Sequence, residues 1–314
     1  MILSQNPYTG ETLKDHREFT SEDIDNALKK ADSQFQEWKG TNFSQRSTLM
    51  LKAAEELKKN KQEYAETITK EMGKPIKQSI AEVEKCAWVC EYYAENAEKQ
   101  LASEEIETDA SKSYVNYSPL GVVLAIMPWN YPFWQVFRFA APALMAGNVG
   151  VLKHASNTMM CGEKIEQVFL RAGFPEGCFQ NLLIGSKKVE EVLVDERVKA
   201  VTLTGSGGAG GAVASTAGKH IKKSVLELGG SNALVVFEDA DLKEALETSV
   251  QARFQNTGQS CIAGKRLLLH ENIAEEFTSK FVEKVKALKA GDPMDEDTFI
   301  GVQARKDLAK DLEK

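Results

Sequence analysis

The chain has 314 residues, of which 42% are hydrophobic and 27% are charged, and its formal net charge is −7. This composition is typical of a globular protein, and the length is sufficient for two domains. The negative charge, without a basic run interleaved with aromatic residues, argues against nucleic-acid binding. The most apolar run, residues 119–129, is far too short to cross a bilayer, so no membrane association is predicted.

The five cysteines indicate a reducing compartment. None belongs to a Cys-x-x-Cys pair, their number is odd, and the N-terminus lacks the charged and apolar regions of a signal peptide. Free thiols and a cytoplasmic location are therefore expected. Cys86 and Cys90 lie four residues apart on a predicted helix but lack His or further Cys partners. Core packing is favoured for this pair, and no metal site is predicted.

The first hundred residues are predicted to form a short extended lead followed by four helices. Thr20 and Asp23 resemble a capping box, which indicates the start of the first helix. The third helix should end at Gly73, because glycine readily adopts the left-handed conformation that closes many helices. The other two helices are expected from residue 44 to about 58 and from about 75 to 101.

Strands and helices alternate regularly from residue 120 onwards. The continuous apolar run at 120–127 suits a strand buried on both faces. Alternation of this kind predicts a Rossmann-type α/β fold, in which a parallel sheet has helices on both faces. The expected strands are 120–127, 149–153, 179–184, 198–203, 223–228, 232–237 and 265–269. The expected helices are 132–146, 158–172, 187–194, 208–218, 241–255 and 273–288.

A glycine-rich segment follows the predicted strand at 198–203. The residues from Gly205 to Gly210 match the pattern G-x-G-x-x-G at a helix start, where main-chain N–H groups can hold a pyrophosphate. The pattern alone is weak evidence in a segment rich in glycine. Glu227, about twenty residues later, is followed by Leu-Gly-Gly, which should end its strand. Its carboxylate is therefore expected to face a site at the sheet edge rather than a ribose, and a solvated strand-end acid is the alternative.

Polar residues also follow two other predicted strands. Asn130 offers an amide just after the first long strand, although an Asn near Pro is usually a turn residue. Lys153 ends the next strand, where a surface lysine is the ordinary interpretation. With Gly205 and Glu227, these residues fall at the carboxyl ends of parallel strands, where open α/β sheets bind ligands.

Cys261 lies in a loop of small residues, Gly-Gln-Ser-Cys at 258–261, between two predicted elements. Such a loop lets a thiol face a cavity while main-chain N–H groups gather around it, which suits an acyl-forming nucleophile. A buried structural cysteine is the alternative for a lone thiol. The polar strand ends described above favour the nucleophile.

These segments together resemble the aldehyde dehydrogenase family. The resemblance rests on five motifs in the family's order and covers the chain from about residue 5 to about residue 305. The branch that the chain resembles most is that of the bacterial succinate-semialdehyde dehydrogenases, which use NADP or NAD. The motifs are Pro-Trp-Asn-Tyr-Pro-Phe at 128–133, Val-Leu-Lys-His-Ala-Ser at 151–156, Leu-Thr-Gly-Ser at 203–206, Leu-Glu-Leu-Gly-Gly at 226–230 and Gly-Gln-Ser-Cys at 258–261.

The resemblance implies a two-domain α/β architecture. Residues 1–229 would form N-terminal helices and a dinucleotide-binding domain, and residues 230–314 would form part of a catalytic domain. Within the first domain, residues 107–119 would belong to an oligomerisation hairpin. The family implies a homodimer or a tetramer that acts on a small-molecule aldehyde.

The resemblance also implies roles for individual residues. Cys261 would attack the aldehyde carbon, while the Asn130 amide and the Cys261 main-chain N–H would hold the oxyanion. After hydride transfer, Glu227 would activate the water that releases the acid from the thioester. Arg138 would bind the substrate carboxylate. The implied cofactor-binding residues are Met127, Pro128, Trp129, Lys153, Ser156, Gly205, Ser206 and Leu228.

Ser156 bears on the choice of cofactor. Strictly NAD-using relatives often carry a glutamate at this place, and its carboxylate would repel a 2′-phosphate. The serine leaves room for that phosphate beside Lys153, so NADP is slightly favoured over NAD. Gln255 stands where some animal succinate-semialdehyde dehydrogenases carry a second substrate arginine, so the substrate carboxylate would depend more heavily on Arg138.

Chains of this family continue beyond the point where this sequence stops, by roughly a third of their length. That part would carry the residues that grip the nicotinamide ribose, much of the substrate pocket and a final strand. From the resemblance we therefore expect weak or no activity and a tendency to aggregate in an isolated 314-residue chain. A catalytically impaired dinucleotide-binding remnant, or a structural partner of full-length subunits, is the alternative function.

Overall fold

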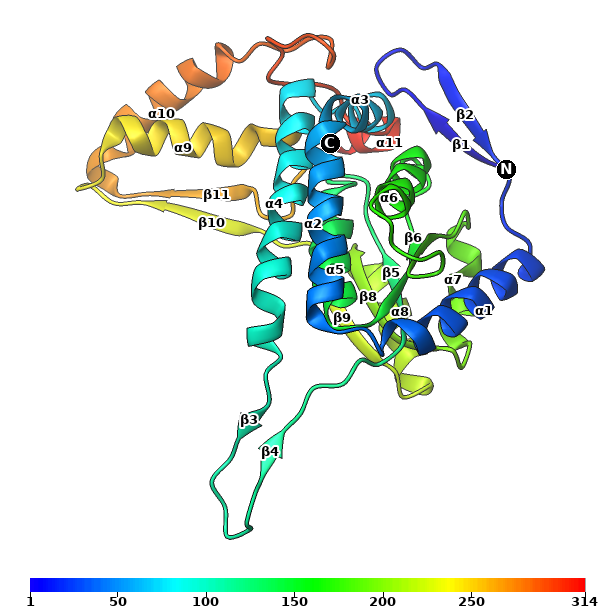
Figure 1. Ribbon diagram of the computed structural model, residues 1–314. Helices are drawn as coiled ribbons and strands as arrows, with labels where there is room; N and C mark the ends of the chain where they lie inside the picture. Colours follow the sequence, from blue (N-terminus) through cyan, green and yellow to red (C-terminus); the bar gives the residue numbers. More distant parts are fainter. Residues whose placement is uncertain (314) are drawn as a thin grey trace.

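The structure, a computed structural model, describes residues 1–313 and is built around a five-stranded parallel sheet (Figure 1). The strand order is β7-β6-β5-β8-β9. The central strands β5 and β6 are almost entirely buried, which explains their continuous apolar sequences. This sheet confirms the Rossmann-type α/β prediction. Its strands are β5 (Val122–Ile126), β6 (Val149–Lys153), β7 (Phe179–Asn181), β8 (Val198–Gly205) and β9 (Lys223–Leu228).

Helices alternate with these strands, as predicted. Two details differ from the prediction. The strand expected at 179–184 is shorter, because the chain turns after Asn181 and Ile184 N–H bonds to the carbonyl of Leu182. The helix expected at 187–194 begins as a single 3-10 turn. The helices are α5 (Trp134–Met145), α6 (Met159–Arg171), η1 (Ser186–Lys188), α7 (Val189–Val194) and α8 (Gly207–Lys219).

A hairpin and four helices precede the sheet, and α2, α3 and α4 pack against α5 and α6. Thr20 and Asp23 form the predicted capping box at the start of α1. Gly73 ends α3 in the left-handed conformation, with φ of 75°, as expected. The elements are β1 (Ile2–Gln5), β2 (Thr12–His16), α1 (Ser21–Trp38), α2 (Phe43–Lys59), α3 (Lys61–Met72) and α4 (Ile76–Gln100).

The link from α4 to β5 forms a thin antiparallel hairpin that extends away from the body of the molecule (Figure 1). It contains β3 (Glu104–Glu105) and β4 (Tyr114–Val115). The large side chains of Ile106, Tyr114 and Tyr117 are exposed on it. Within residues 1–313, none of the helices is long and apolar enough to cross a membrane.

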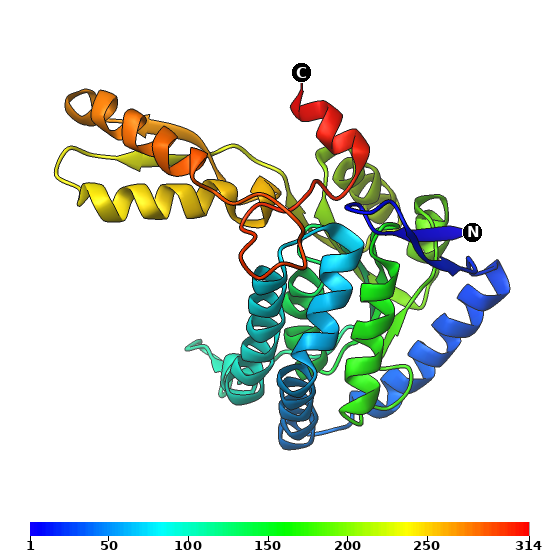
Figure 2. The same cartoon turned by 90° about the horizontal axis from the view of Figure 1, so that it is seen from above.

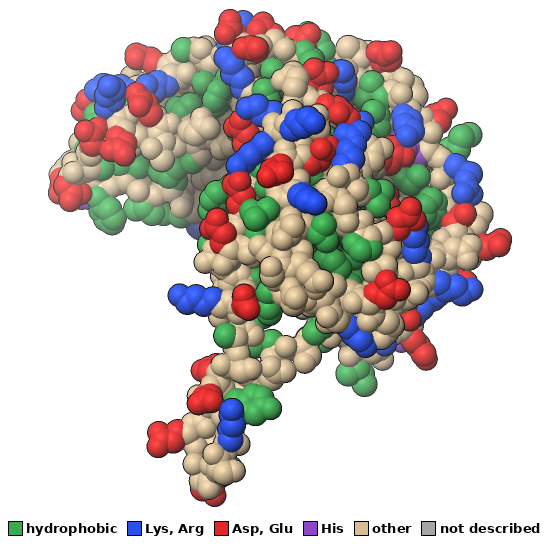
Figure 3. Space-filling view, in the orientation of Figure 1, with side chains coloured by type: hydrophobic (Ala, Val, Ile, Leu, Met, Phe, Trp, Pro, Cys, Tyr) green, Lys and Arg blue, Asp and Glu red, His purple; other side chains and the backbone are tan. Residues whose placement is uncertain are grey.

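A smaller unit projects from the main body (Figures 1 and 2). Val236, Leu246 and Phe277 form its own buried core between two parallel strands and two helices. The opposite face of these strands exposes Val235 and Phe237, and apolar side chains line the lower edge of this unit in Figure 3. Its elements are β10 (Asn232–Val236), α9 (Leu242–Phe254), η2 (Gln255–Gly258), β11 (Gly264–Leu269) and α10 (Glu271–Lys286).

Residues 289–304 return from this unit to the main body and pack on the connection between α3 and α4. Ile76 N–H donates to the Pro293 carbonyl at 2.8 Å. Gly301 packs so closely on Gly73 that an added Cβ would lie 2.2 Å from the Gly73 carbonyl oxygen. The last described helix, α11 (Lys306–Leu312), follows. This return segment ties the smaller unit to the helices that cover the sheet.

Candidate active site

A cleft opens at the carboxyl edge of the sheet, between the strand ends and the loop at 258–261. Its volume is about 340 Å³. Its walls combine residues far apart in the sequence, because the carboxyl ends of parallel strands meet at one edge of a sheet. Of the predicted site residues, it brings together Pro128, Trp129, Asn130, Arg138, Gly205, Ser206, Glu227, Leu228 and Cys261.

The loop before Cys261 has an unusual backbone. Asn256, Thr257 and Gly258 have φ of 56°, 57° and 74°, so three successive residues are left-handed. This conformation costs energy in residues other than glycine and persists only where the surroundings hold it. The buried Asn256 supplies such a hold, because its side-chain amide donates to the Asn130 carbonyl at 2.7 Å. The loop leaves Cys261 partly exposed at the cleft.

Asn130 lies beside this loop with part of its hydrogen-bonding capacity unused. Its Nδ2 donates to the main-chain oxygen of Gln259 at 3.1 Å, and an amide nitrogen carries two N–H groups. The main-chain N–H of Cys261 makes no hydrogen bond to any residue in the described range 1–313. Two N–H donors are therefore left at the cleft that holds the thiol, and an oxyanion needs donors of this kind.

Glu227 and Arg138 form a second charged feature of the cleft. The Glu227 carboxylate lies 3.8 Å from the Arg138 guanidinium, and the two side chains are 55% and 40% exposed. Both groups are therefore accessible to a small molecule. The predicted cofactor residue Met127 is not in this cleft but lines an adjoining cavity of about 590 Å³, which Arg138 and Glu227 also border.

Lys153 and Ser156 line a separate cavity of about 640 Å³ at the end of β6. Lys153 is only 8% exposed, and burial lowers the pKa of its amine. Its amine makes no hydrogen bond or ion pair with the part of the chain that the structure describes, and burial is the only cause that acts on its pKa. A buried amine without a partner is energetically unfavourable, so this position is suited to a bound anion.

Arg305 also lines the cavity of Lys153, and sequence reasoning missed it. Its guanidinium is held by Asp307, to which Nε donates at 3.0 Å and Nη2 at 2.6 Å. The sequence carried no signal for this position, since Arg305 lies in none of the motifs and far along the chain from Lys153. Gln259 lies inside the Gly-Gln-Ser-Cys motif, but sequence reasoning gave it no role, because only the folded loop shows that its carbonyl holds the Asn130 amide.

The start of α8 is open towards the cleft. Ser206 caps this helix with its side chain. An added Cβ at Gly207 or Gly208 would meet no atom within 4 Å, so there is open space beside the first turn of this helix, where N–H groups can hold an anion. At Gly210 an added Cβ would lie 2.7 Å from the Leu228 side chain, so this glycine allows close packing of α8 on β9. With the unpaired Lys153 at the other cavity, these features fit a dinucleotide.

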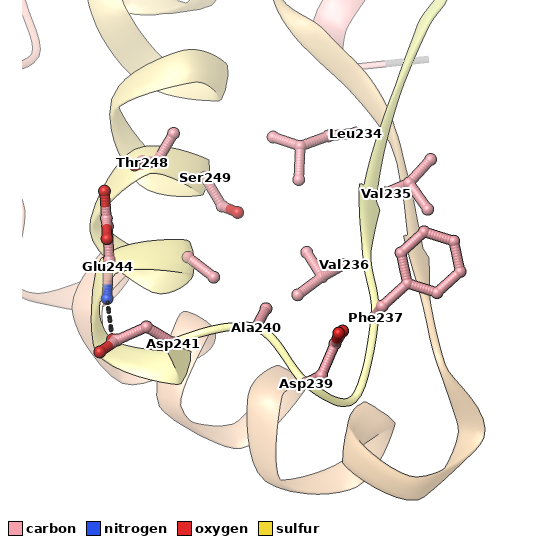
Figure 4. A pocket seen from close by; sticks show the side chains of 11 residues that line it. Leu234, Val235, Val236, Phe237, Asp239, Ala240, Asp241, Glu244, Thr248 and Ser249 are labelled. Atoms are coloured by element: carbon pink, nitrogen blue, oxygen red, sulfur yellow. Dashed lines mark hydrogen bonds between the residues drawn. The ribbon is translucent and has the colours of Figure 1, made fainter.

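Another cavity, of about 410 Å³, lies between β10 and α9 and shares no lining residue with the cleft (Figure 4). Leu234 and Val236 point towards α9, whereas Val235 and Phe237 point away from it. No thiol, imidazole or amine lines this cavity. Its polar walls carry carboxylates and hydroxyls, and it therefore lacks the thiol that distinguishes the cleft.

The cysteines other than Cys261 are all buried. Cys86 and Cys90 pack within α4, as core packing requires. In the stretch from Met1 to Glu313, no group of three or more His, Cys, Asp or Glu residues could hold a metal ion.

Comparison with known proteins identifies the family. The aldehyde dehydrogenase family model matches residues 2–314. A probable succinate-semialdehyde dehydrogenase (NADP+) from Synechocystis sp. is 51% identical over 311 residues, which cover 99% of this chain and 68% of that protein. A succinate-semialdehyde dehydrogenase (NADP+) from Mycobacterium avium is 49% identical over 320 residues, with the same two coverages of 99% and 68%.

A solved structure shows the same fold. The crystal structure of succinic semialdehyde dehydrogenase from Streptococcus pyogenes in complex with NADP+ is 34% identical and has a TM-score of 0.97. The match covers 99% of this chain and 69% of that chain. The chain therefore spans somewhat more than two thirds of the length of these relatives. Since the family model and these relatives match nearly all of its residues, the protein belongs to the aldehyde dehydrogenase family.

Proposed function

We propose that the protein oxidises succinate semialdehyde to succinate, with NADP or NAD as the hydride acceptor. One observation carries the proposal: a single cleft holds a partly exposed thiol, two unused N–H donors and a carboxylate. The substrate is inferred from relatives that are 51% and 49% identical and are named succinate-semialdehyde dehydrogenases (NADP+). Together these observations support acyl chemistry on an aldehyde.

In this proposal Cys261 is the nucleophile. Its thiolate adds to the aldehyde carbon, and the carbonyl oxygen becomes an oxyanion that the Asn130 amide and the Cys261 N–H hold. The bound cofactor supplies the hydride acceptor. Loss of the hydride leaves a thioester on Cys261. Glu227 takes a proton from the water that attacks this thioester, succinate leaves, and the thiolate is restored.

The proposed cofactor residues follow the carboxyl edge of the sheet. Lys153 and Ser156 would hold the adenosine ribose and, in NADP, its 2′-phosphate, because Lys153 is a buried cation without a partner. NADP is the cofactor that this cation and the absence of a carboxylate at Ser156 favour. The nicotinamide half would lie nearer the thiol, along Met127, Pro128, Trp129, Gly205, Ser206 and Leu228.

For the far end of the substrate we propose Arg138. A guanidinium suits a carboxylate, and Arg138 lines the same cleft as Cys261. Its position 3.8 Å from Glu227 has a consequence for the reaction. The carboxylate of succinate semialdehyde would compete with Glu227 for this guanidinium, and so would free Glu227 to approach water.

We also propose a division of the chain at residue 229, a homodimer or tetramer, and a cytoplasmic location. Separate sheets and a separate core at Val236, Leu246 and Phe277 support residues 1–229 and 230–314 as two domains, although Ala304 packs in the core of the main body. The exposed apolar side chains of the 107–119 hairpin support association with further copies. The free thiols support a reducing compartment.

A second candidate function is dinucleotide binding without turnover, alone or beside longer subunits. The exposed apolar face at Val235 and Phe237 favours it, because a complete catalytic domain would be expected to bury such a face. The two candidates differ in one measurable respect. A change in NADPH fluorescence on binding, with no succinate formed from succinate semialdehyde and NADP, would support the second candidate.

The first candidate is tested by substituting two cysteines separately. Cys261→Ala should abolish NADPH formation and iodoacetamide labelling of the partly exposed thiol, and should leave NADP affinity unchanged. Cys178→Ala is the matched control, since Cys178 is buried beside β7 and does not line the cleft. This variant should keep both NADPH formation and iodoacetamide labelling of Cys261. Oxidation that persists in Cys261→Ala would reject the proposed mechanism.

A further inference from the structure

Two buried charged residues lie next to the turn that carries Asn130. Lys74 follows α3, Glu82 lies on α4, and their side chains form an ion pair that is almost completely enclosed. Removing two charges from water is costly, and a buried pair of this kind is weak evidence for stability. The contacts that the pair makes with its neighbours point to another role.

The Glu82 carboxylate defines where α5 begins. Its Oε1 accepts hydrogen bonds from the main-chain N–H groups of Phe133 and Trp134, both at 2.9 Å. The helix has no side-chain cap of its own and no acidic residue in its first turn. The negative charge of Glu82 therefore supplies the missing partner for the positive end of α5. The turn at 128–132 is held between β5 and this contact.

The Lys74 amine reaches the same turn from the other side. Its Nζ lies 3.8 Å from the centre of the Tyr131 ring, a cation–π contact. The main-chain N–H of Tyr131 donates to Asn130 Oδ1 at 3.1 Å, which orients the amide. Burial raises the pKa of the Tyr131 hydroxyl to about 12, and Ser260, the residue before Cys261, acts on this hydroxyl by lowering its pKa. Lys74 thus contacts Tyr131, which lies between Asn130 and the loop that carries Cys261.

We propose that the Lys74–Glu82 pair positions the Asn130 amide relative to Cys261. The two residues touch neither substrate nor cofactor in this proposal, so they are positioning residues. Their effect should fall on the step that forms the oxyanion, and not on cofactor affinity. The inference rests on the proposed function, because it assigns Asn130 to the oxyanion.

Glu71 provides a matched control within the same chain. It is also a buried glutamate that accepts two main-chain N–H groups at a helix start, from Met160 at 2.9 Å and Cys161 at 2.8 Å. These belong to α6, and the other hydrogen-bond partner of Glu71 within residues 1–313 is Ser4, not the turn at 128–132. Glu71→Gln and Glu82→Gln therefore replace a carboxyl group by an amide at two similar helix starts, only one of which adjoins Asn130. Burial raises the pKa of Glu71 to about 7, so the two variants are compared at about pH 8.5, where Glu71 is ionised.

The test is a double-mutant cycle that measures the rate constant of the first NADPH burst. The burst amplitude is normalised to the titrated Cys261 thiols. Asn130→Ala should lower the rate constant about 100-fold, as expected for loss of an oxyanion donor. Glu82→Gln should lower it about 10-fold in the wild-type background and less than about twofold in Asn130→Ala, since groups that act through one another are not additive. Glu71→Gln should change it less than about twofold, even if it lowers stability.

Two results would overturn the inference. One is an equal loss from Glu82→Gln with and without Asn130, and the other is an equal effect of Glu71→Gln and Glu82→Gln. If Asn130→Ala itself leaves the burst unchanged, the proposed function fails instead. Amide hydrogen exchange decides the matter without turnover: Glu82→Gln should speed exchange across residues 128–134, and unchanged exchange there would also refute the inference.

Discussion

At the scale of single residues, His154 connects the two turns that carry Asn130 and Lys153. The imidazole is fully buried, and its Nε2 lies 2.9 Å from the Pro132 carbonyl. Its Nδ1 accepts the Ala155 N–H at 2.8 Å, so the proton is on Nε2 and is donated to Pro132. Burial is the main cause that lowers the pKa of His154 to about 4.

This lowered pKa predicts a loss of stability in acid. Well above pH 6.5, the ordinary pKa of histidine, the imidazole is neutral in both states and its contribution to the free energy of unfolding is complete. As the pH falls from 6.5 to about 4, the unfolded chain takes up a proton that the folded chain resists. Urea unfolding of the wild type should therefore lose up to about 3 kcal/mol more than unfolding of His154→Gln over this range.

His220 is the control for this experiment. It is exposed at the end of α8, and His220→Gln should keep the pH dependence of the wild type. If His154→Gln shows that same dependence as well, then His154 does not resist protonation in the folded protein.

The sequence predicted which residues end the strands, but not what holds them there. Local apolar patterns predict where each strand ends, and the ends of parallel strands meet at one edge of a sheet. Asn130, Lys153 and Glu227 could therefore be placed at that edge. The partners of these residues could not be placed in this way. The contact between Gln259 and Asn130 and the place of Arg305 beside Lys153 arise only through the fold, and no periodic pattern encodes a contact between segments so far apart.

At the scale of elements, the segment at 289–304 acts as a brace for the thiol loop. Gly301 N–H donates to Thr257 Oγ1 at 3.0 Å, and the Gln259 side chain accepts the Ala304 N–H at 2.9 Å. These bonds help to hold the left-handed run before Cys261. The sequence offered no element for this segment, because its order comes from contacts with other loops.

Gly301→Ala should weaken this brace. The added Cβ would lie 2.2 Å from the Gly73 carbonyl oxygen, and a backbone atom cannot move aside as a side chain can. We expect the free energy of unfolding, measured in urea, to fall by about 1–3 kcal/mol. Faster iodoacetamide labelling of Cys261 should accompany the loss, because the loop would open.

Gly211→Ala is the opposite case. Gly211 is exposed within α8, and an added Cβ would meet no atom within 4 Å. Helix propensity should then raise stability by about 1 kcal/mol. Equal effects of Gly301→Ala and Gly211→Ala would contradict the claim that residues 289–304 support the loop before Cys261.

The boundaries of most elements could be predicted, because they depend on local signals. Thr20 and Gly73 are examples, since a cap and a left-handed glycine act within one turn of the chain. The strand β7 was predicted too long because its apolar sequence continues to Ile184 after the strand pairing ends. Pairing with β6, and not apolar character, sets its length.

At the scale of the whole molecule, the smaller unit has a small core and an exposed apolar face. Phe237 is 64% exposed, and Val235 lies on the same face of β10. We expect Phe237→Lys to reduce self-association of the 314-residue chain, as measured by light scattering at rising concentration. Leu312→Lys removes an equally exposed apolar side chain outside this face and should have little effect. Equal effects of the two would show that the face is not the cause.

The central claim is that Cys261 carries the acyl group that Glu227 releases. Glu227→Gln offers the most direct measurement, because it should stop the reaction at the thioester. With succinate semialdehyde and NADP, this variant should form one NADPH per titrated Cys261 and then stop. Mass spectrometry should find one succinyl group on the peptide that contains Cys261. Continued turnover at the wild-type rate, or a burst with no adduct on Cys261, would contradict the account.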